Sequence, residues 1–509
     1  MPDMNQRLKK ALCLVLMPLL LMGCTQEELP EDESVLPQDT VVQEIPSRTI
    51  LPDLFSLPYA PELTLDPVTC SDGMQYVISS LVCEGLFRLG PDFMPVPWLC
   101  ETYTYDAETF TYVFSLRTDV NFSDGSPLTG NDVKATLLRA KNSERYGARL
   151  AQVSSVSADE YTVTVKLLSA NTSFPALLDI PVLKAGTEDA PAGTGPYLFS
   201  VENSAAWLIA NQSWWRGAGQ PVDRIALVEA SDQDTMLYRF TSHDVQLITA
   251  DLTGTDPISA TGSIVYQDTD TTILHYLGCN VTREPLDNAS FRRLLSQGID
   301  RSLLVSAFFS GHGVAAQFPV SPKSPLYPAN LEQTYTRSDF AAAVAEIGYS
   351  ADRTLTLLVN QENSFKLSAA QQIADTFSDV GIPTAVKALP WDEYTAALAA
   401  GEFDLYYGEI KLTADWNLSS LLGVESPLNY GGWAGTMFDQ YHSNYLSSSA
   451  PAVELERLCS YLQTQSPILP ICFKSTSVLL QTGVLEGLNP TMSEPFYNFT
   501  DCTVHLAEN

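Results

Sequence analysis

An alternation of strand-like and helix-like segments between residues 354 and 407 restricts the fold more than any other feature of the sequence. Three short apolar segments predict strands, and two longer segments between them have apolar residues at helical spacing and end at Gly381 and Gly401. The predicted strands are residues 354–360, 384–389 and 403–407, and the predicted helices are residues 366–380 and 391–400. This β-α-β-α-β order indicates a parallel sheet, because parallel neighbours need a crossover connection that is usually a helix.

The loop that follows the third of these strands is the predicted place for a ligand. Open α/β sheets bind ligands in the crevice beyond the carboxyl ends of their strands. After Tyr407 the loop carries Glu409, Lys411, Asp415 and Trp416. We therefore expect a binding site near these side chains.

Other elements are predicted on both sides of this alternation. Residues 110–116 alternate in polarity, which predicts a strand with one buried face. Three helices are predicted after residues that are suitable N-caps, which are Thr129, then Asp287 or Asn288, and then Asp300.

The N-terminal segment has the layout of an export signal. Three basic residues precede an apolar run from Ala11 to Met22, which is too short for a permanent membrane span. The run ends at Gly23-Cys24, and residues 21–24 resemble the lipobox of bacterial lipoproteins, in which the cysteine is lipidated and becomes the mature N-terminus. We expect residues 1–23 to be a signal peptide, Cys24 to be lipidated and residues 24–50 to be an acidic flexible tether. The alternative is an ordinary cleaved signal with an incidental cysteine.

Composition excludes some classes of function. The formal net charge is −32, from 28 basic and 60 acidic residues, and such a chain repels nucleic-acid backbones. Apolar residues make up 45% of the chain, which is enough for several cores. The nine cysteines are widely spaced and form neither a disulfide framework nor a zinc pattern, although one bridge is possible.

Motifs of catalysis and cofactor binding are missing from the sequence. It has no G-x-S-x-G nucleophile elbow, no phosphate-binding loop and no paired histidines at metal-ligand spacing. The segment 311–316 matches a dinucleotide fingerprint only loosely, because it follows a predicted helix instead of a strand. We expect no catalytic residues, no metal and no cofactor.

A specific pattern begins at Phe110. Residues 110–117, 120–129 and 132–133 (FTYVFSLR, VNFSDGSPLT, DV) resemble the signature of family 5 extracellular solute-binding proteins, the peptide- and nickel-binding components of bacterial ABC importers. Further matching segments follow in the family's order, and they are residues 84–86 with Arg88, residues 193–197, Asn211 with Trp214-Trp215, residues 291–294 and residues 299–301. Tyr103 stands where the family commonly has tryptophan.

The resemblance implies an α/β, two-lobed, periplasmic-binding-protein-like (type II) fold with mixed sheets and hinge strands. Residues 51–269, completed by residues 476–509, would form lobe I, and residues 270–475 would form lobe II. The implied protein is a monomer, lipid-anchored on the outer face of the bacterial cytoplasmic membrane. It would capture a peptide or similar solute between its lobes and deliver it to an ABC permease and ATPase complex.

The resemblance also implies site residues. Peptide-binding members hold the ligand's α-ammonium with an aspartate in the loop after such a strand, and residues 413–416 (TADW) match that motif, which makes Asp415 the first candidate. The alternative is that Asp415 caps a helix that starts near Asn417. Apolar walls are expected from Trp416, Tyr407, Tyr430 and Trp433, each of which is otherwise a core residue.

Glu409 is a departure from the family pattern. Some oligopeptide binders have an arginine six residues before the aspartate, where it meets a ligand carboxylate. Glu409 would repel a carboxylate and favour a cationic or extended ligand, or it is paired with Lys411. Strict dipeptide specificity is therefore not expected.

Two other classes of function stay open on sequence alone. A surface-anchored peptide hydrolase with a dispersed catalytic site is one, because catalytic triads need no local motif. A peptide-sensing receptor is the other, because import and sensing use the same lobe closure.

Overall fold

The computed structural model describes residues 51–217, 219–349 and 353–508. The predicted signal peptide, Cys24 and the predicted tether lie outside the described residues. Within the described part of the chain, no helix combines the length and the apolar character that crossing a membrane requires.

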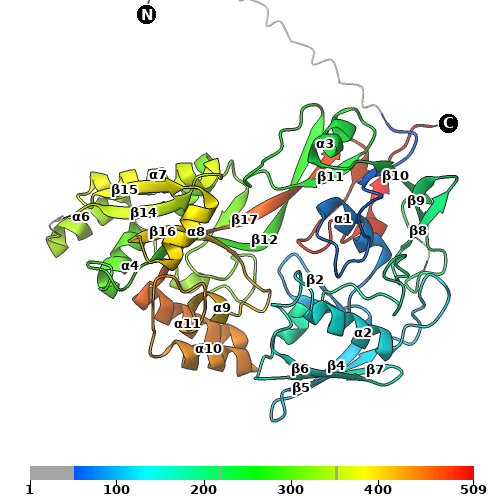
Figure 1. Ribbon diagram of the computed structural model, residues 1–509, viewed down its shortest axis with the longest axis horizontal. Coiled ribbons are helices and arrows are strands. Elements are labelled where there is room, and N and C mark those ends of the chain that lie inside the picture. Colours follow the sequence, from blue (N-terminus) through cyan, green and yellow to red (C-terminus); the bar gives the residue numbers. More distant parts are fainter. Residues whose placement is uncertain (1–50, 218, 350–352, 509) are drawn as a thin grey trace, which may run out of the picture. The chain divides into compact units, whose positions relative to one another are not determined.

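A seven-stranded mixed sheet contains the alternation seen in the sequence (Figure 1). Its strand order is β11-β17-β12-β16-β14-β15, and β13 pairs with β17. The strands are β11 (Leu247–Ala250), β12 (Ile264–Cys279), β13 (Gly313–Ala315), β14 (Leu355–Asn360), β15 (Thr384–Leu389), β16 (Leu405–Lys411) and β17 (Ile468–Gln481).

The predicted β-α-β-α-β segment is confirmed. The helices α7 (Ser364–Asp379) and α8 (Trp391–Ala399) connect β14, β15 and β16, and β14 pairs in parallel with both other strands. Strand β16 continues to Lys411, beyond the predicted end at residue 407, because its antiparallel pairing with β12 extends to the pair Ile273 and Lys411. The pairing of neighbours, which hydropathy does not report, therefore sets this strand's length.

Several helices lie in the segments that connect the strands of this sheet. They are α4 (Ala289–Gln297), α5 (Arg301–Leu303), α6 (Arg337–Ile347), α9 (Ser419–Leu422), α10 (Phe438–Ser447) and α11 (Pro451–Gln465), with the 3₁₀ turn η3 (Ala329–Leu331). Asn288 caps α4 and Asp300 caps α5, as expected. The helix predicted after Asp300 is α-helical for one turn only and continues as the π-helical turn η2 (Leu304–Phe308).

Two four-stranded sheets lie outside the seven-stranded sheet. One is antiparallel, in the order β4-β5-β7-β6, and the other has the order β1-β10-β9-β8 with β1 and β10 parallel. The first consists of β4 (Cys100–Asp106), β5 (Thr111–Leu116), β6 (Val153–Ala158) and β7 (Thr162–Leu167), and the second of β1 (Ser56–Tyr59), β8 (Tyr197–Glu202), β9 (Ala205–Ala210) and β10 (Arg224–Glu229). Smaller elements are α1 (Gly73–Val82), β2 (Phe87–Leu89), β3 (Pro95–Pro97), α2 (Gly130–Lys141), η1 (Phe174–Leu177), α3 (Gln233–Thr241), β18 (Leu485–Glu486), η4 (Phe499–Asp501) and β19 (Thr503–Val504).

The predictions for the segment 110–140 are also confirmed. Along β5 the side chains of Tyr112, Phe114 and Leu116 are buried and alternate with partly exposed ones. Thr129 is the N-cap of α2 and forms a capping box with Asp132. The buried face of β5 and the apolar face of α2 belong to one hydrophobic cluster, so these two elements share a core.

Strands β12 and β17 are unusually long and pair along most of their length (Figure 1). Near β11 the residues 264–270 of β12 pair with residues 475–481 of β17, and near β16 the residues 274–278 pair with residues 468–473. The register shifts between Asp270 and Leu274. A shift of this kind bends and twists a strand pair locally, so the two halves of the ladder differ in direction.

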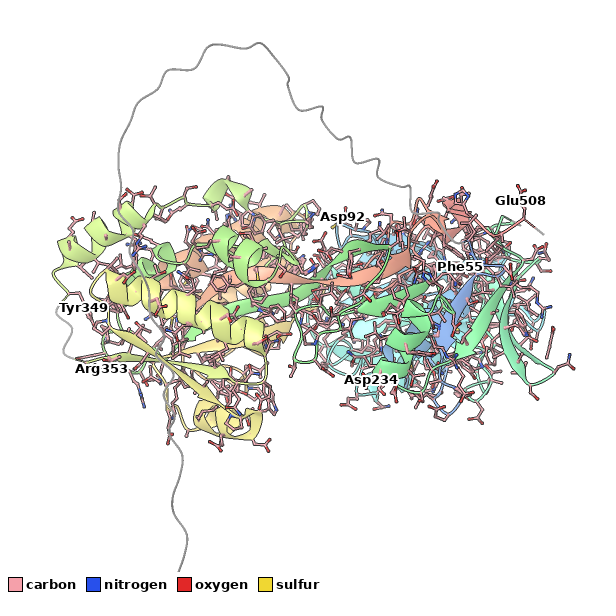
Figure 2. All side chains as sticks on the ribbon, turned by 90° about the horizontal axis from the view of Figure 1, so that it is seen from above. Phe55, Asp92, Asp234, Tyr349, Arg353 and Glu508 are labelled. Carbon is pink, nitrogen blue, oxygen red and sulfur yellow. The ribbon has the colours of Figure 1, made fainter. Side chains whose placement is uncertain are left out.

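The first and last described segments lie side by side. The amide of Ala507 donates to the carbonyl of Pro52 at 2.9 Å, and Figure 2 places Phe55 and Glu508 in the same part of the molecule. The cysteines at 70, 83, 100, 279, 459, 472 and 502 are all buried and free in the described chain. The possible disulfide is thus not formed among them.

Candidate functional site

The loop after β16 is anchored to β12. The amide of Leu412 donates to the carbonyl of Thr272 at 2.9 Å, and the Thr272 hydroxyl donates to the carbonyl of Leu412 at 2.6 Å. A turn follows, in which the amide of Trp416 donates to the carbonyl of Thr413 at 2.9 Å. These bonds fix the backbone of the predicted site.

Trp416 anchors this turn through its buried side chain. Its backbone has φ of 50°, a left-handed conformation that is rare for a bulky residue. The indole is 1% exposed and contacts Phe93 and Phe473 edge-on, with ring centroids 5.5 and 5.8 Å away. Packing of the ring between two aromatic side chains stabilises the strained backbone, and such strain is concentrated at functional sites.

Asp415 is fully buried and bonded within the protein. Its carboxylate accepts hydrogen bonds from Asn171 Nδ2 at 2.8 Å, from the Thr413 hydroxyl at 2.5 Å and from the Asn417 amide at 3.3 Å. Burial raises the pKa of Asp415, although the donors oppose this shift. The helix α9 begins at Ser419 with Leu418 as its N-cap, so the carboxylate does not serve as the helix cap.

The contact between Asp415 and Asn171 joins segments 244 positions apart in sequence. The neighbouring Thr172 donates through its amide to the carbonyl of Leu446 at 2.7 Å and through its hydroxyl to that of Ser448 at 2.9 Å. The hydroxyl of Tyr112 on β5 donates to the carbonyl of Asn171 at 2.8 Å. The segment around Asn171 thus bridges the antiparallel sheet and the loop after β16.

Three predicted aromatic residues pack into the core. Tyr407 is 1% exposed, and its hydroxyl lies 3.2 Å from Nδ1 of His275. Trp433 is buried against Phe438, and the half-buried Tyr430 packs edge-on against Tyr406. Of the predicted aromatic walls, only Trp416 belongs to the turn that contains Asp415.

Glu409 forms an ion-pair cluster. One carboxylate oxygen lies 2.5 Å from Nζ of Lys366 and 3.4 Å from Nε2 of His275, and the other lies 3.6 Å from Nζ of Lys474. Burial alone would raise the pKa of Glu409, but these neighbours lower it to about 2. The predicted pairing of Glu409 with Lys411 is not formed, because the partners of the carboxylate are His275, Lys366 and Lys474. The lysines that neutralise Glu409 come instead from α7 and β17.

A hollow with about 770 Å³ of empty volume lies beside the loop after β16. From the loop, residues 411–414 line it. From elsewhere in the chain, it is lined by Tyr76, Leu89, Arg145, Tyr146, Ala148, Arg149, Asp179, Met492 and Ser493. Asp415, the next residue along the loop, is 1% exposed and is not among the residues that line this hollow.

Apart from Lys411, which belongs to the predicted loop, the charged groups that line this cavity were not predicted. The side chain of Arg149 pairs with Asp179, and Arg145 lies over the ring of Tyr76 at 3.8 Å. Lys411 also lines the cavity, and burial together with the two nearby arginines lowers its pKa. A signal for the site was present in the sequence, where two arginines four residues apart follow a predicted helix in a chain that has only 28 basic residues.

The model of the family described as bacterial extracellular solute-binding proteins, family 5 Middle, matches residues 94–424. The chain belongs to this family. The resemblance seen in the sequence is therefore confirmed, and the protein is a solute-binding protein and not an enzyme.

Curated relatives and solved structures agree with this assignment. The glutathione-binding protein GsiB of Escherichia coli (strain K12) is 24% identical over 442 residues, which are 80% of this chain and 86% of the relative. The GsiB protein of Salmonella typhi is 24% identical over 420 residues, covering 77% and 81%.

Two solved structures have the same fold. The nickel ABC transporter structure from Bacillus halodurans has a TM-score of 0.75 at 18% identity and covers 89% of this chain and 100% of its own. The oligopeptide-binding protein AppA from Bacillus subtilis, in complex with a nonapeptide, has a TM-score of 0.60 at 18% identity, with coverage of 89% and 100%. The expected α/β, two-lobed, type II fold with mixed sheets and hinge strands is confirmed.

Proposed function

We propose that this family 5 solute-binding protein captures a peptide or similar solute in the cavity beside the loop after β16 and delivers it to an ABC permease and ATPase complex. The observation that supports the proposal is that the residues lining the cavity come from both segments of the chain that are expected to form lobes. Residues 411–414 belong to the segment expected as lobe II, while Tyr76, Arg145 and Asp179 belong to the segment expected as lobe I. A solute in the cavity touches both segments, so it binds a closed arrangement better than an open one.

The proposed lobes are those expected from the sequence, with residues 51–269 and 476–509 in lobe I and residues 270–475 in lobe II. The register shift on β12 begins at Asp270, which pairs with Ser475 of β17. A bend in a continuous strand pair is a suitable hinge, because two strands absorb the rotation without breaking the chain's path.

Asp415 is proposed to hold the positive end of the solute. In the structure Asn171 Nδ2 donates to one carboxylate oxygen of Asp415, which is 1% exposed, so a ligand ammonium would take the place of this amide when the loop opens to the cavity. Trp416 supports the turn, and Glu409 acts through its lysine pairs by fixing the end of β16. Tyr407, Tyr430 and Trp433 are proposed to shape the wall by packing behind it.

The remaining parts of the proposal come from the N-terminal sequence. Lipidation of Cys24 would hold a monomeric protein on the outer face of the cytoplasmic membrane, with residues 24–50 as a tether. The relatives named as glutathione-binding and the neighbour bound to a nonapeptide favour peptide-like solutes.

Binding and closure test this proposal together. The protein is purified under native conditions, and mass spectrometry identifies any solute that is released when it is denatured. Small-angle X-ray scattering then measures the radius of gyration of the solute-free protein before and after that solute is added. We expect recovery of an intact peptide-like molecule and a smaller radius of gyration with it bound. An unchanged radius of gyration with solute bound would contradict capture by closure, and binding without a permease and ATPase encoded nearby would favour the peptide-sensing receptor.

A further inference from the structure

The cavity beside the loop after β16 has a charge opposite to that of the whole chain. The protein has a formal net charge of −32. The cavity, however, is lined by Arg145, Arg149 and Lys411, with Asp179 as the acidic residue among its lining side chains. Cations gathered in one hollow of an acidic protein focus a local field that attracts anions.

One of the cations is already neutralised within the wall. The guanidinium of Arg149 forms an ion pair with Asp179 and also donates to the carbonyl of Leu177 at 2.9 Å. Asp179 in turn accepts a hydrogen bond from the hydroxyl of Ser493 at 2.5 Å. This pair is a fixed part of the wall, and it leaves Arg145 and Lys411 as the cations available to a solute.

Arg145 is held in position by contacts with Cys70 and Tyr76, and none of the described acidic side chains forms a salt bridge with it. Its Nη1 donates to the carbonyl of Cys70 at 3.1 Å, and its guanidinium lies over the ring of Tyr76 at 3.8 Å. These contacts fix the plane of the guanidinium. A planar guanidinium has five N–H donors in a fork, so several remain for a ligand.

Lys411 is the second cation of this wall, and the negative charge of Asp179 only partly offsets the effect of the two arginines on it. Among residues 51–508, apart from the gaps at 218 and 350–352, its ammonium forms no hydrogen bond or salt bridge. Its side chain lines the cavity, and burial beside Arg145 and Arg149 lowers its pKa. Arg145 and Lys411 are nevertheless both exposed to solvent, so their cationic groups can be reached by a solute that enters the hollow, and two like charges at one wall attract an anion.

We propose, on the basis of the function proposed above, that the solute is an acidic peptide with two carboxylates, one bound by Arg145 and the other by Lys411. A guanidinium fork matches the geometry of a carboxylate, and an ammonium accepts an anionic oxygen from several directions. Leu89, Tyr146 and Met492 provide an apolar wall that suits the carbon skeleton of a peptide better than a bare inorganic anion.

Calorimetry with the full-length protein tests the proposal, using a panel of di- and tripeptides. Each acidic peptide, such as Ala-Glu, is compared with an analogue in which both carboxyl groups are amides. The panel also contains basic peptides and inorganic phosphate. We expect amidation to weaken binding at least tenfold. Lys411→Met and Arg145→Gln should each remove most of this preference, whereas Lys387→Met, which changes an exposed lysine of β15, should leave it intact.

The outcomes separate this inference from the proposed function. Neutral or basic peptides that bind as tightly as acidic ones, or a preference that survives Lys411→Met and Arg145→Gln, overturn the inference and leave a peptide receptor. Binding of inorganic phosphate alone supports an anion site but contradicts the peptide assignment in both proposals. A panel with no binding member overturns both. Thermal unfolding of each variant shows that it is folded before its affinity is interpreted.

Discussion

Replacing Asp415 with asparagine removes a negative charge and keeps the shape of the side chain. In the unliganded protein the variant amide oxygen can still accept from Thr413 and Asn417, but the amide nitrogen meets the donor Asn171 Nδ2. One hydrogen bond is lost, which costs about 1 kcal/mol. Burial raises the pKa of Asp415, so stability is lost as the pH rises from the unfolded value through the raised one, and the cost is complete above it. Asparagine removes this cost, and we expect the free energy of unfolding at pH 7 to change by about 1 kcal/mol or less.

The effect on binding should be larger than the effect on stability. A charge-assisted hydrogen bond from a ligand ammonium contributes about 1.5–3 kcal/mol, which corresponds to a loss of about 10- to 150-fold in affinity. The assay is calorimetry with the tightest peptide found and with its N-acetylated form, which has no ammonium. Acetylation should weaken binding to the natural protein by this factor, and it should have little effect on Asp415→Asn.

Equal losses on acetylation in both proteins would refute the role of Asp415. The carboxylate would then serve only to join Asn171 to the loop. Asn171→Ala is the matched control, because it removes the same contact and keeps the charge. In that variant the dependence on acetylation should persist.

Three further predictions concern stability and location. Glu409→Gln should lower the free energy of unfolding by up to about 3 kcal/mol at pH 7, because the natural pKa is held at about 2, and by less to the extent that solvent screens the 25% exposed side chain. The stabilisation from a lowered pKa is complete above the unfolded value and is lost as the pH falls through the folded value, so urea titrations should find about 1 kcal/mol left at pH 3. An equal effect at both pH values, or the same loss in the exposed control Glu402→Gln, would contradict this. Gly278→Ala should lower the stability by about 1–3 kcal/mol in thermal unfolding, because its Cβ would lie 2.0 Å from the Tyr406 ring, whereas Gly73→Ala, with open space around it, should not. Cys24→Ser should move the protein from the membrane fraction to the soluble fraction and abolish fatty-acid labelling, and retention in the membrane would refute lipidation at this residue.

The elements that could be predicted are those whose periodicity is local. The helices α7 and α8 and the strands between them combine a clear hydrophobic period with a glycine at the helix end. The caps Thr129, Asn288 and Asp300 are local signals of the same kind. In contrast, the length of β16 depends on its pairing with β12, a strand more than a hundred residues earlier, and no local pattern encodes that contact.

The candidate site was only partly predictable for the same reason. The loop after β16 could be located, because sheet topology places ligands at the carboxyl ends of strands. The partners of its charged residues could not, since Asn171, Lys366 and Lys474 come from distant elements. Proximity in sequence suggested Lys411 as the partner of Glu409, whereas the structure leaves Lys411 for the cavity.

The position of β17 has a consequence for biogenesis. It is the last long strand to be synthesised, yet it lies between β11 and β12 inside the seven-stranded sheet. A nascent or truncated polypeptide that stops before Ile468 leaves the edges of both neighbours open, and open edges promote aggregation and attract proteases. The order of synthesis thus delays completion of the seven-stranded sheet until nearly the whole chain has emerged.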